Sequence, residues 1–177
     1  MNKQKIDWIF YPKNNLIPEL LSSTVDVFEQ NINKIDSTEN DNNLNRLKSD
    51  EVLRVISNGL EELSYQVEKS KKAIDKIRIP VMFGKGGVEE LAFEADAYHP
   101  EFKTVVEVEA GRAVINYQFL KDIFQASMML NTDYLVMAVR KSYRGQNDFE
   151  KINSFLEAMY LTNKIKLDLK GILLIGY

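Results

Sequence analysis

Three acidic residues lie close together in the sequence, in a pattern suited to binding a divalent cation. Glu107 and Glu109 alternate with valines, and Asp96 precedes them within the stretch Leu91–Ala113. Alternate residues of a strand point to the same face, so we expect the two glutamates to project together. If a hairpin brings Asp96 alongside, the carboxylates converge. Such a cluster is costly unless a cation neutralises it, and hard oxygen ligands suit Mg²⁺ or Mn²⁺.

A simpler interpretation is that these glutamates form the solvated face of an antiparallel sheet, which accounts for many strands with this pattern. Two features favour a site. The small residues after Glu109 (Ala110-Gly111-Arg112-Ala113) are typical of a strand end that stays open. The strand also leads into an amphipathic helix, which indicates a central strand rather than an edge strand.

Length and composition limit the classes of protein to consider. A chain of 177 residues is most simply one domain with a substantial core, and the absence of cysteine excludes disulfides and zinc-thiolate sites. The N-terminus lacks a signal-peptide core and no segment is apolar enough to span a membrane, so we expect a cytoplasmic protein. The net charge of −3 argues against general affinity for nucleic acid, although phosphate contacts need only a local basic patch.

The elements that must position the acidic residues can be assigned from periodicity. We expect a helical N-terminal segment (1–30), an Asn/Asp-rich linker (31–48) and a core (49–177). The core begins with a helix capped by Ser49 or Asp50, followed by either a short strand at 65–68, which we favour, or a continuation of that helix. The remaining predicted elements are a hairpin of strands 77–83 and 88–98, a helix at 114–130, a buried strand at 134–139, a helix ending near 160 and a last strand at 171–175.

A β-meander followed by strand-helix-strand units predicts an α/β fold, a mixed β-sheet flanked by helices on both faces. This order, with its acidic residues, resembles the PD-(D/E)XK nuclease superfamily over residues 49–140. Asp96 and Glu107 match the acidic positions of the superfamily motif. Glu109 replaces its lysine, and no proline precedes Asp96. Some restriction endonucleases of the superfamily are similar in carrying an acidic residue at that third position. The resemblance therefore implies a restriction-endonuclease-like core.

The resemblance implies a metal-dependent phosphodiesterase that acts on DNA. By analogy with the superfamily, Asp96, Glu107 and the backbone carbonyl of Val108 would bind Mg²⁺ or Mn²⁺. Glu109 would orient or deprotonate the attacking water and could touch a second metal. Double-strand cleavage would suit a homodimer, with the aromatic N-terminal segment as a candidate interface.

Further residues would complete such a site. A helix glutamate often does so in the superfamily; Glu51 is the best match here, with Glu61 and Glu62 as alternatives. Arg112 is the candidate replacement for the missing lysine charge, although it could equally be an exposed arginine at a helix end. Gln118 and Lys121 are weaker candidates for phosphate contact.

Two other features are interpreted as structural. His99 is the only histidine and precedes a proline, which is typical of a turn. The glycine cluster 84–87 lacks the spacing of a phosphate-binding loop and indicates a hairpin turn. The alternative function is a non-catalytic nucleic-acid-binding or assembly module on a nuclease-like fold, which the negative net charge and the missing lysine favour.

Overall fold

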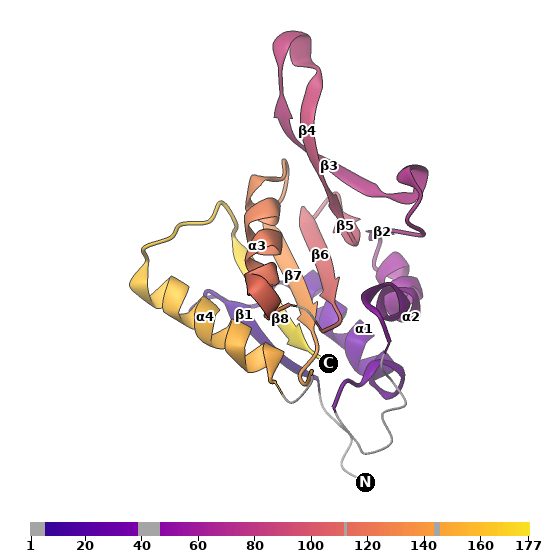
Figure 1. The fold of residues 1–177 in the computed structure, drawn as a ribbon, viewed down its shortest axis with the longest axis vertical. Coiled ribbons are helices and arrows are strands. Elements are labelled where there is room, and N and C mark those ends of the chain that lie inside the picture. Colours follow the sequence, from indigo (N-terminus) through magenta and orange to yellow (C-terminus); the bar gives the residue numbers. More distant parts are fainter. Residues whose placement is uncertain (1–5, 39–46, 112, 144–145) are drawn as a thin grey trace.

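A computed structural model describes residues 6–38, 47–111, 113–143 and 146–177. Its centre is a six-stranded mixed sheet in the order β1-β8-β7-β6-β5-β2 (Figure 1). The strands are β1 (Asp7–Tyr11), β2 (Gln66–Val67), β5 (Ala97–His99), β6 (Thr104–Glu109), β7 (Tyr134–Val139) and β8 (Gly171–Gly176). β6, β7 and β8 run parallel, whereas β1, β5 and β2 pair antiparallel to their neighbours.

Helices cover both faces of this sheet, as the sequence predicts. α1 (Glu19–Ile35) and α2 (Ser49–Glu62) pack on one face, where they meet alternate residues of the central strands. α3 (Gln118–Met128) and α4 (Asp148–Thr162) pack on the other face, against the intervening residues. The protein therefore has an α/β fold in which a mixed sheet lies between two layers of helices.

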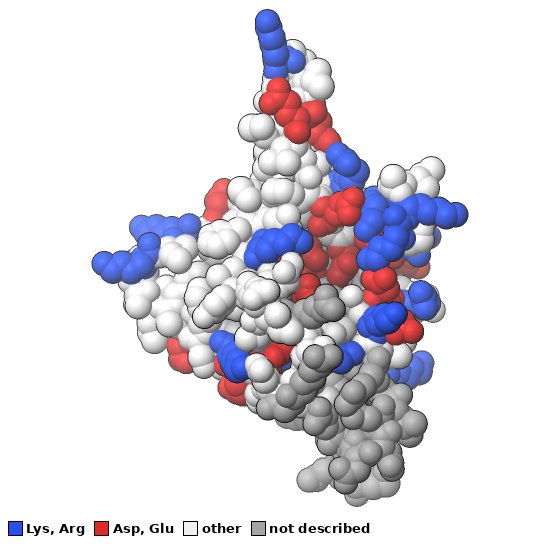
Figure 2. All heavy atoms as spheres, in the orientation of Figure 1, with Lys and Arg blue, Asp and Glu red and all other residues white. Residues whose placement is uncertain are grey.

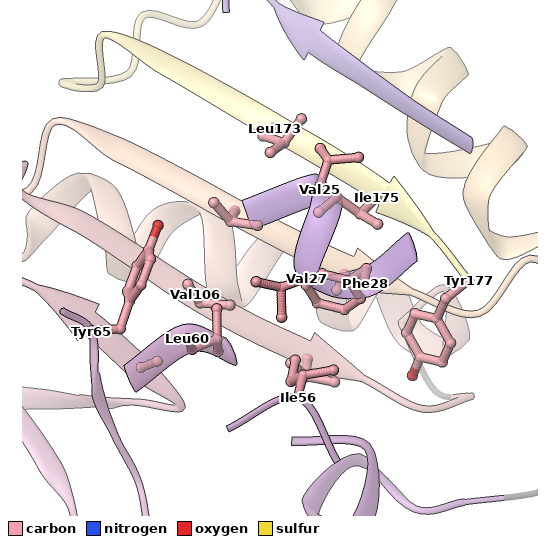
Figure 3. Packing of buried hydrophobic residues seen from close by; sticks show 14 of the residues in the cluster. Val25, Val27, Phe28, Ile56, Leu60, Tyr65, Val106, Leu173, Ile175 and Tyr177 are labelled. Carbon is pink, nitrogen blue, oxygen red and sulfur yellow. The ribbon is translucent and has the colours of Figure 1, made fainter. Parts of the chain in front are cut away.

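The central strands are apolar on both faces because helices cover both. β7 (YLVMAV) and β8 (GILLIG) are almost entirely buried. Figure 3 shows the core beneath α1 and α2, where Phe28, Ile56 and Leu60 meet Val106 of β6 and Ile175 of β8. These side chains pack one face of β6 into the core beneath α1 and α2.

The hairpin of β3 (Ile77–Phe83) and β4 (Glu89–Ala95) forms a separate two-stranded sheet that stands away from the body (Figure 1). The predicted strand 88–98 is therefore divided: β4 belongs to this arm, and β5 joins the main sheet. The break falls at Asp96, which lies in a bend between the two. An acidic residue that the sequence pattern placed within a strand thus lies where the chain passes from one sheet to the other.

The N-terminal segment is more integrated than expected. β1 is an edge strand paired with β8, and α1 continues to Ile35, into the range assigned to the linker. Phe10 and Tyr11 are buried in the protein's own core, whereas Trp8 remains 43% exposed. Two of the aromatic side chains proposed for a dimer interface are therefore used internally. The linker residues 39–46 lie outside the described residues.

The remaining predicted elements are present with small changes in their limits. The favoured short strand at 65–68 is β2, and the helix predicted from residue 114 begins at Gln118, after a 3-10 turn at Ile115–Tyr117. Asn147 caps α4, its Oδ1 accepting a hydrogen bond from the backbone N–H of Glu150 at 3.1 Å. Among the described residues, none of the helices has the length and apolar character needed to cross a bilayer.

Candidate active site

The two glutamates of β6 lie on one face of the sheet. Val106 and Val108 belong to the core under α1 and α2, whereas Val105 belongs to the core under α3 and α4. Since side chains alternate along a strand, Glu107 and Glu109 share the face of Val105 and point toward the α3 side. The prediction that they project together is confirmed. Both are partly buried, so this is not a solvated sheet face.

Asp96 is tied to β6 by a hydrogen bond. The backbone N–H of Val108 donates to Asp96 Oδ2 at 2.8 Å. The β5–β6 ladder pairs Ala97 with Val106, and continuing its register by one position places Asp96 opposite Glu107. The regular ladder ends at this point, so the Asp96 carboxylate satisfies a donor that no further strand residue reaches.

Burial and mutual repulsion alter the proton affinity of these carboxylates. Burial chiefly raises the pKa of Glu107 well above its usual range, and the charges of Asp96, Asp122 and Glu109 raise it further. Burial followed by the charges of Asp122 and Asp96 raises the pKa of Glu109 to about 7. Burial also raises the pKa of Asp96 to about 6, although the hydrogen bond from Val108 opposes this. Such shifts are typical of functional sites.

The sequence pattern did not identify Asp122, which α3 adds to the cluster. Its side chain lies on the buried face of the helix, in line with Phe119, Ile123 and Ala126. The residue is only 5% exposed, and burial raises its carboxyl pKa to about 6. An aspartate interrupting an apolar helical stripe was the signal that could have identified it. Lys121, beside it on the same helix, is exposed, and its charge lowers the pKa values of Glu107, Glu109 and Asp122.

An ion-pair network borders the site on the β2 side. Glu68, whose side chain is 6% exposed, pairs with Lys76 at 2.9 Å and with Lys71 at 3.1 Å. Lys71 also pairs with Asp50 of α2 at 2.8 Å. The charges of Glu68, Lys71 and Asp50 all act on Asp96, so this network lies near that carboxylate. In Figure 2, acidic and basic side chains accordingly gather beside each other below the arm.

A hollow of about 470 Å³ adjoins this network. Its lining includes Arg54, Asn58, Lys69 and Lys71 from α2 and from the segment after β2. These side chains offer cations and hydrogen-bond donors immediately beside the acidic cluster. Asp50, Glu61 and Glu68 line the same hollow and pair with Lys69 and Lys71, so its charges are mixed.

The residues predicted to complete the site differ in their positions and contacts. Glu51 accepts a hydrogen bond from the Lys48 backbone N–H at 2.7 Å and so caps α2. Its neighbour Asp50 is the residue of α2 whose charge acts on Asp96. Glu61 lines the hollow, and its Oε1 lies 3.9 Å from Nζ of Lys69. Glu62 is exposed. Arg112 lies outside the described residues.

His99 has a structural role, as expected. It is 3% exposed, and its ring meets those of Tyr65 and Phe102 edge-on at centroid distances of 5.2 and 5.1 Å. Its Nδ1 accepts the backbone N–H of Phe102 at 3.2 Å. The glycine cluster 84–87 forms the turn between β3 and β4, as predicted.

The carboxylates are near one another without forming a finished metal site. Across the described ranges, no group of three or more histidine or acidic side chains is arranged closely enough to hold a metal ion. Mutual repulsion keeps ionised carboxylates apart unless a cation or protons offset their charge. The donor set of carboxylates and the Val108 carbonyl is nevertheless the oxygen-rich type that Mg²⁺ and Mn²⁺ prefer.

The fold and the acidic centre together define an α/β protein with a restriction-endonuclease-like core. A family model described as "Putative halobacteria restriction endonuclease" matches residues 19–177. Because the match covers most of the chain, the protein belongs to this family. The match begins at the first residue of α1, so the family unit includes that helix as well as the core from residue 49. A search of curated proteins gave no match.

Proposed function

We propose that this protein is a Mg²⁺- or Mn²⁺-dependent endonuclease of the PD-(D/E)XK type that cleaves DNA, with Glu109 in place of the superfamily lysine. One observation carries the proposal: Asp96 is hydrogen-bonded to the strand that directs Glu107 and Glu109 to one partly buried face. The family's description supports DNA as the substrate.

Asp96, Glu107 and the carbonyl of Val108 would hold the metal. The carboxylates are already adjacent in register, and a cation would relieve the repulsion that raises their pKa values. A bound Mg²⁺ would supply Lewis acidity at a phosphate oxygen and would lower the pKa of coordinated water. The hydrogen bond from Val108 N–H would keep Asp96 oriented while its other carboxylate oxygen remains available.

Glu109 is the proposed acceptor of the water proton. Hydrolysis adds the water oxygen to phosphorus, breaks one phosphodiester P–O bond, and leaves a proton to be accepted and a leaving oxygen to be protonated from solvent. A group with a pKa of about 7 is well matched to the first task near neutral pH, before any metal lowers that value. The exposed ammonium group of Lys121, beside the same carboxylates, would offset negative charge on the phosphate.

The hollow beside β2 would carry the DNA backbone toward the site. Arg54, Lys69 and Lys71 provide cations there, although the chain as a whole has a net charge of −3. A divalent cation at the acidic centre would also be needed to reduce its repulsion of phosphate. We therefore expect DNA binding to depend on the metal as well as on these side chains.

The test is cleavage of supercoiled and linear plasmid DNA by the purified protein with Mg²⁺ or Mn²⁺. Wild type should cut, and Glu107→Gln should lose the activity while keeping the wild-type circular dichroism spectrum. Glu29→Gln, on the exposed side of α1, is the matched control and should remain active. A folded wild type that cuts neither DNA nor RNA with any divalent metal would contradict the proposal. That result would favour the alternative, a binding or assembly module on this fold.

A further inference from the structure

Tyr177 forms a hydrogen bond to the strand that carries the proposed base. The residue is fully buried, and its ring lies in the core under α1 and α2, 6.3 Å from the ring of Phe28 (Figure 3). Its hydroxyl donates a hydrogen bond to the backbone carbonyl of Glu109 at 3.1 Å. Tyr177 directly follows β8, and β7 lies between β8 and β6, so this hydrogen bond reaches across a strand. It therefore connects the core on one face of the sheet to a residue whose side chain points toward the other face.

The backbone of Tyr177 is itself held by hydrogen bonds. Its N–H donates to the carbonyl of Val139 at 3.0 Å, and its carbonyl accepts the N–H of Lys141 at 3.0 Å. The hydroxyl of Ser37, just beyond α1, also donates to that carbonyl. A tyrosine has two side-chain torsions, and close packing in a core restricts both. The Tyr177 hydroxyl is therefore presented to β6 at a defined point.

The environment of Tyr177 keeps its hydroxyl a hydrogen-bond donor. Burial raises the pKa of Tyr177 above its ordinary value of 10.0, although the charge of Arg140 opposes this. The phenol therefore stays protonated near neutral pH. Arg140 is buried beside it, and its guanidinium donates to the carbonyl of Leu47, just before α2. These contacts tie the ends of β7 and β8 to the start of α2.

The part of β6 that carries the glutamates has lost one neighbouring strand. The β5–β6 ladder ends at Val106, whereas the β6–β7 ladder continues to Glu109. Glu109 is the last residue of β6, and the chain then bends at Gly111, whose φ is +105°. Strand ends with few hydrogen bonds are among the segments that open most readily. The hydrogen bond from Tyr177 adds a constraint at this point.

We propose that Tyr177 is a positioning residue for Glu109. This inference rests on the proposed function, in which Glu109 accepts the proton of the attacking water. The carbonyl carbon of Glu109 is bonded to the Cα that bears its side chain, so fixing the carbonyl fixes the direction in which that side chain leaves the strand. A misplacement of about 1 Å at a reacting group can cost on the order of 10²-fold in rate. Tyr177 thus acts on the reaction through Glu109, from the opposite face of the sheet.

The test is a double-mutant cycle between Tyr177→Phe and Glu109→Gln, measured by steady-state cleavage of a short DNA duplex. Tyr177→Phe keeps the ring and removes only the hydroxyl. We expect it to lower kcat about 10-fold with little change in KM. In the Glu109→Gln background it should change kcat by less than about twofold, because the positioned carboxylate is gone. An equal loss in both backgrounds, or an unchanged kcat in Tyr177→Phe, would overturn the proposal.

Tyr65→Phe is the matched control. Tyr65 is also a buried tyrosine of the core under α1 and α2, and its hydroxyl lies 3.0 Å from Oγ1 of Thr24 on α1 (Figure 3). This variant loses a comparable buried hydrogen bond, so its thermal stability should fall much as that of Tyr177→Phe does. Its kcat should nevertheless stay close to that of wild type. A similar loss of kcat in both variants would overturn the proposal, because any lost buried hydroxyl would then have the same effect.

Amide hydrogen exchange, followed by mass spectrometry without metal or DNA, separates this inference from the proposed function. Peptides covering residues 105–111 should exchange faster in Tyr177→Phe than in wild type or Tyr65→Phe, because the end of β6 has lost a constraint. Unchanged exchange there would overturn the positioning role even in an active enzyme. A folded wild type that cleaves no DNA would end the proposed function and the catalytic part of this inference. Faster exchange in Tyr177→Phe would then identify a purely structural constraint on β6.

Discussion

Glu109 is an ionisable group in a partly buried position, so its protonation is coupled to folding. Its pKa in the folded protein is about 7, above its ordinary value of 4.5. Between these values the native state binds more protons than the unfolded state, so this group's contribution to stability is present at low pH and is lost as pH rises through 7. At about 1.4 kcal/mol per pKa unit, the loss is on the order of 3 kcal/mol.

This linkage predicts the behaviour of Glu109→Gln in a metal-free buffer. Urea unfolding at about pH 5 and about pH 8 should show wild type losing more free energy of unfolding than the variant as pH rises. The comparison with the variant cancels the titration of groups that do not interact with Glu109; the variant also removes the charge that raises the pKa of Glu107, which is part of the same effect. Glu29→Gln, at an exposed position of α1, should keep the wild-type pH dependence. Parallel curves for wild type and Glu109→Gln would mean that Glu109 titrates normally.

The same substitution tests the chemistry assigned to Glu109. Glutamine keeps the shape and hydrogen-bonding capacity but lacks the basic oxygen, so kcat should fall on the order of 10²-fold while KM changes little. Glu109→Lys should retain part of the activity, because an ammonium group can also orient water and offset phosphate charge. Steady-state cleavage of a short DNA duplex provides both constants. An active enzyme indifferent to Glu109→Gln would remove Glu109 from the mechanism without affecting Asp96 and Glu107.

At the level of single residues, the sequence revealed the features that local periodicity determines. The alternation of glutamate and valine correctly placed Glu107 and Glu109 on one face. The sequence offered Asp122 only as an acidic residue on an apolar helical stripe, and could not show that α3 places this residue near the glutamates of β6. Nor could it show that the charge of Asp50 acts on Asp96 while Glu51 caps its own helix. Which of the two acidic residues of α2 acts on Asp96 depends on the rotation of the helix and on the pairing of Asp50 with Lys71, which are tertiary features.

At the level of elements, α1 is part of the core that supports the site. Phe28 is fully buried and its ring lies 6.3 Å from that of Tyr177. Phe28→Ala should lower the free energy of unfolding by about 3–5 kcal/mol. Leu16→Ala is the control, because Leu16 is 95% exposed and its truncation should have little effect. A loss below about 1 kcal/mol for Phe28→Ala in urea unfolding would show that α1 is a detachable appendage.

The sequence predicted most elements but only part of their pairing. The apolar run of β7 and the glycine turn of the arm are local signals, and each marked its element correctly. β1 was missed because its antiparallel partner β8 lies at the opposite end of the described chain. The division of the predicted strand at Asp96 was also missed, since a bend between two sheets has no strong sequence signal.

At the level of the whole molecule, charged side chains are clustered in particular places rather than spread evenly. The net charge of −3 coexists with an acidic centre bordered by Lys71, Lys76 and the cations of the hollow. The sheet and its two helical layers form the body of the molecule, and the β3–β4 arm projects beyond them (Figure 1). This distribution is consistent with a protein that needs a divalent cation before it can accept a phosphate backbone.

The proposed function depends above all on Asp96 and Glu107 sharing one metal ion, and a crystal structure of the protein soaked with Mn²⁺ would examine this directly. We predict an anomalous-scattering peak at the bend between β4 and β5. It should lie about 2.1–2.3 Å from a carboxylate oxygen of each residue and from the Val108 carbonyl oxygen. Asp96→Asn crystals should lack that peak. An ion bound only elsewhere at saturating Mn²⁺, with the carboxyl groups of Asp96 and Glu107 more than about 8 Å apart, would contradict the shared metal site.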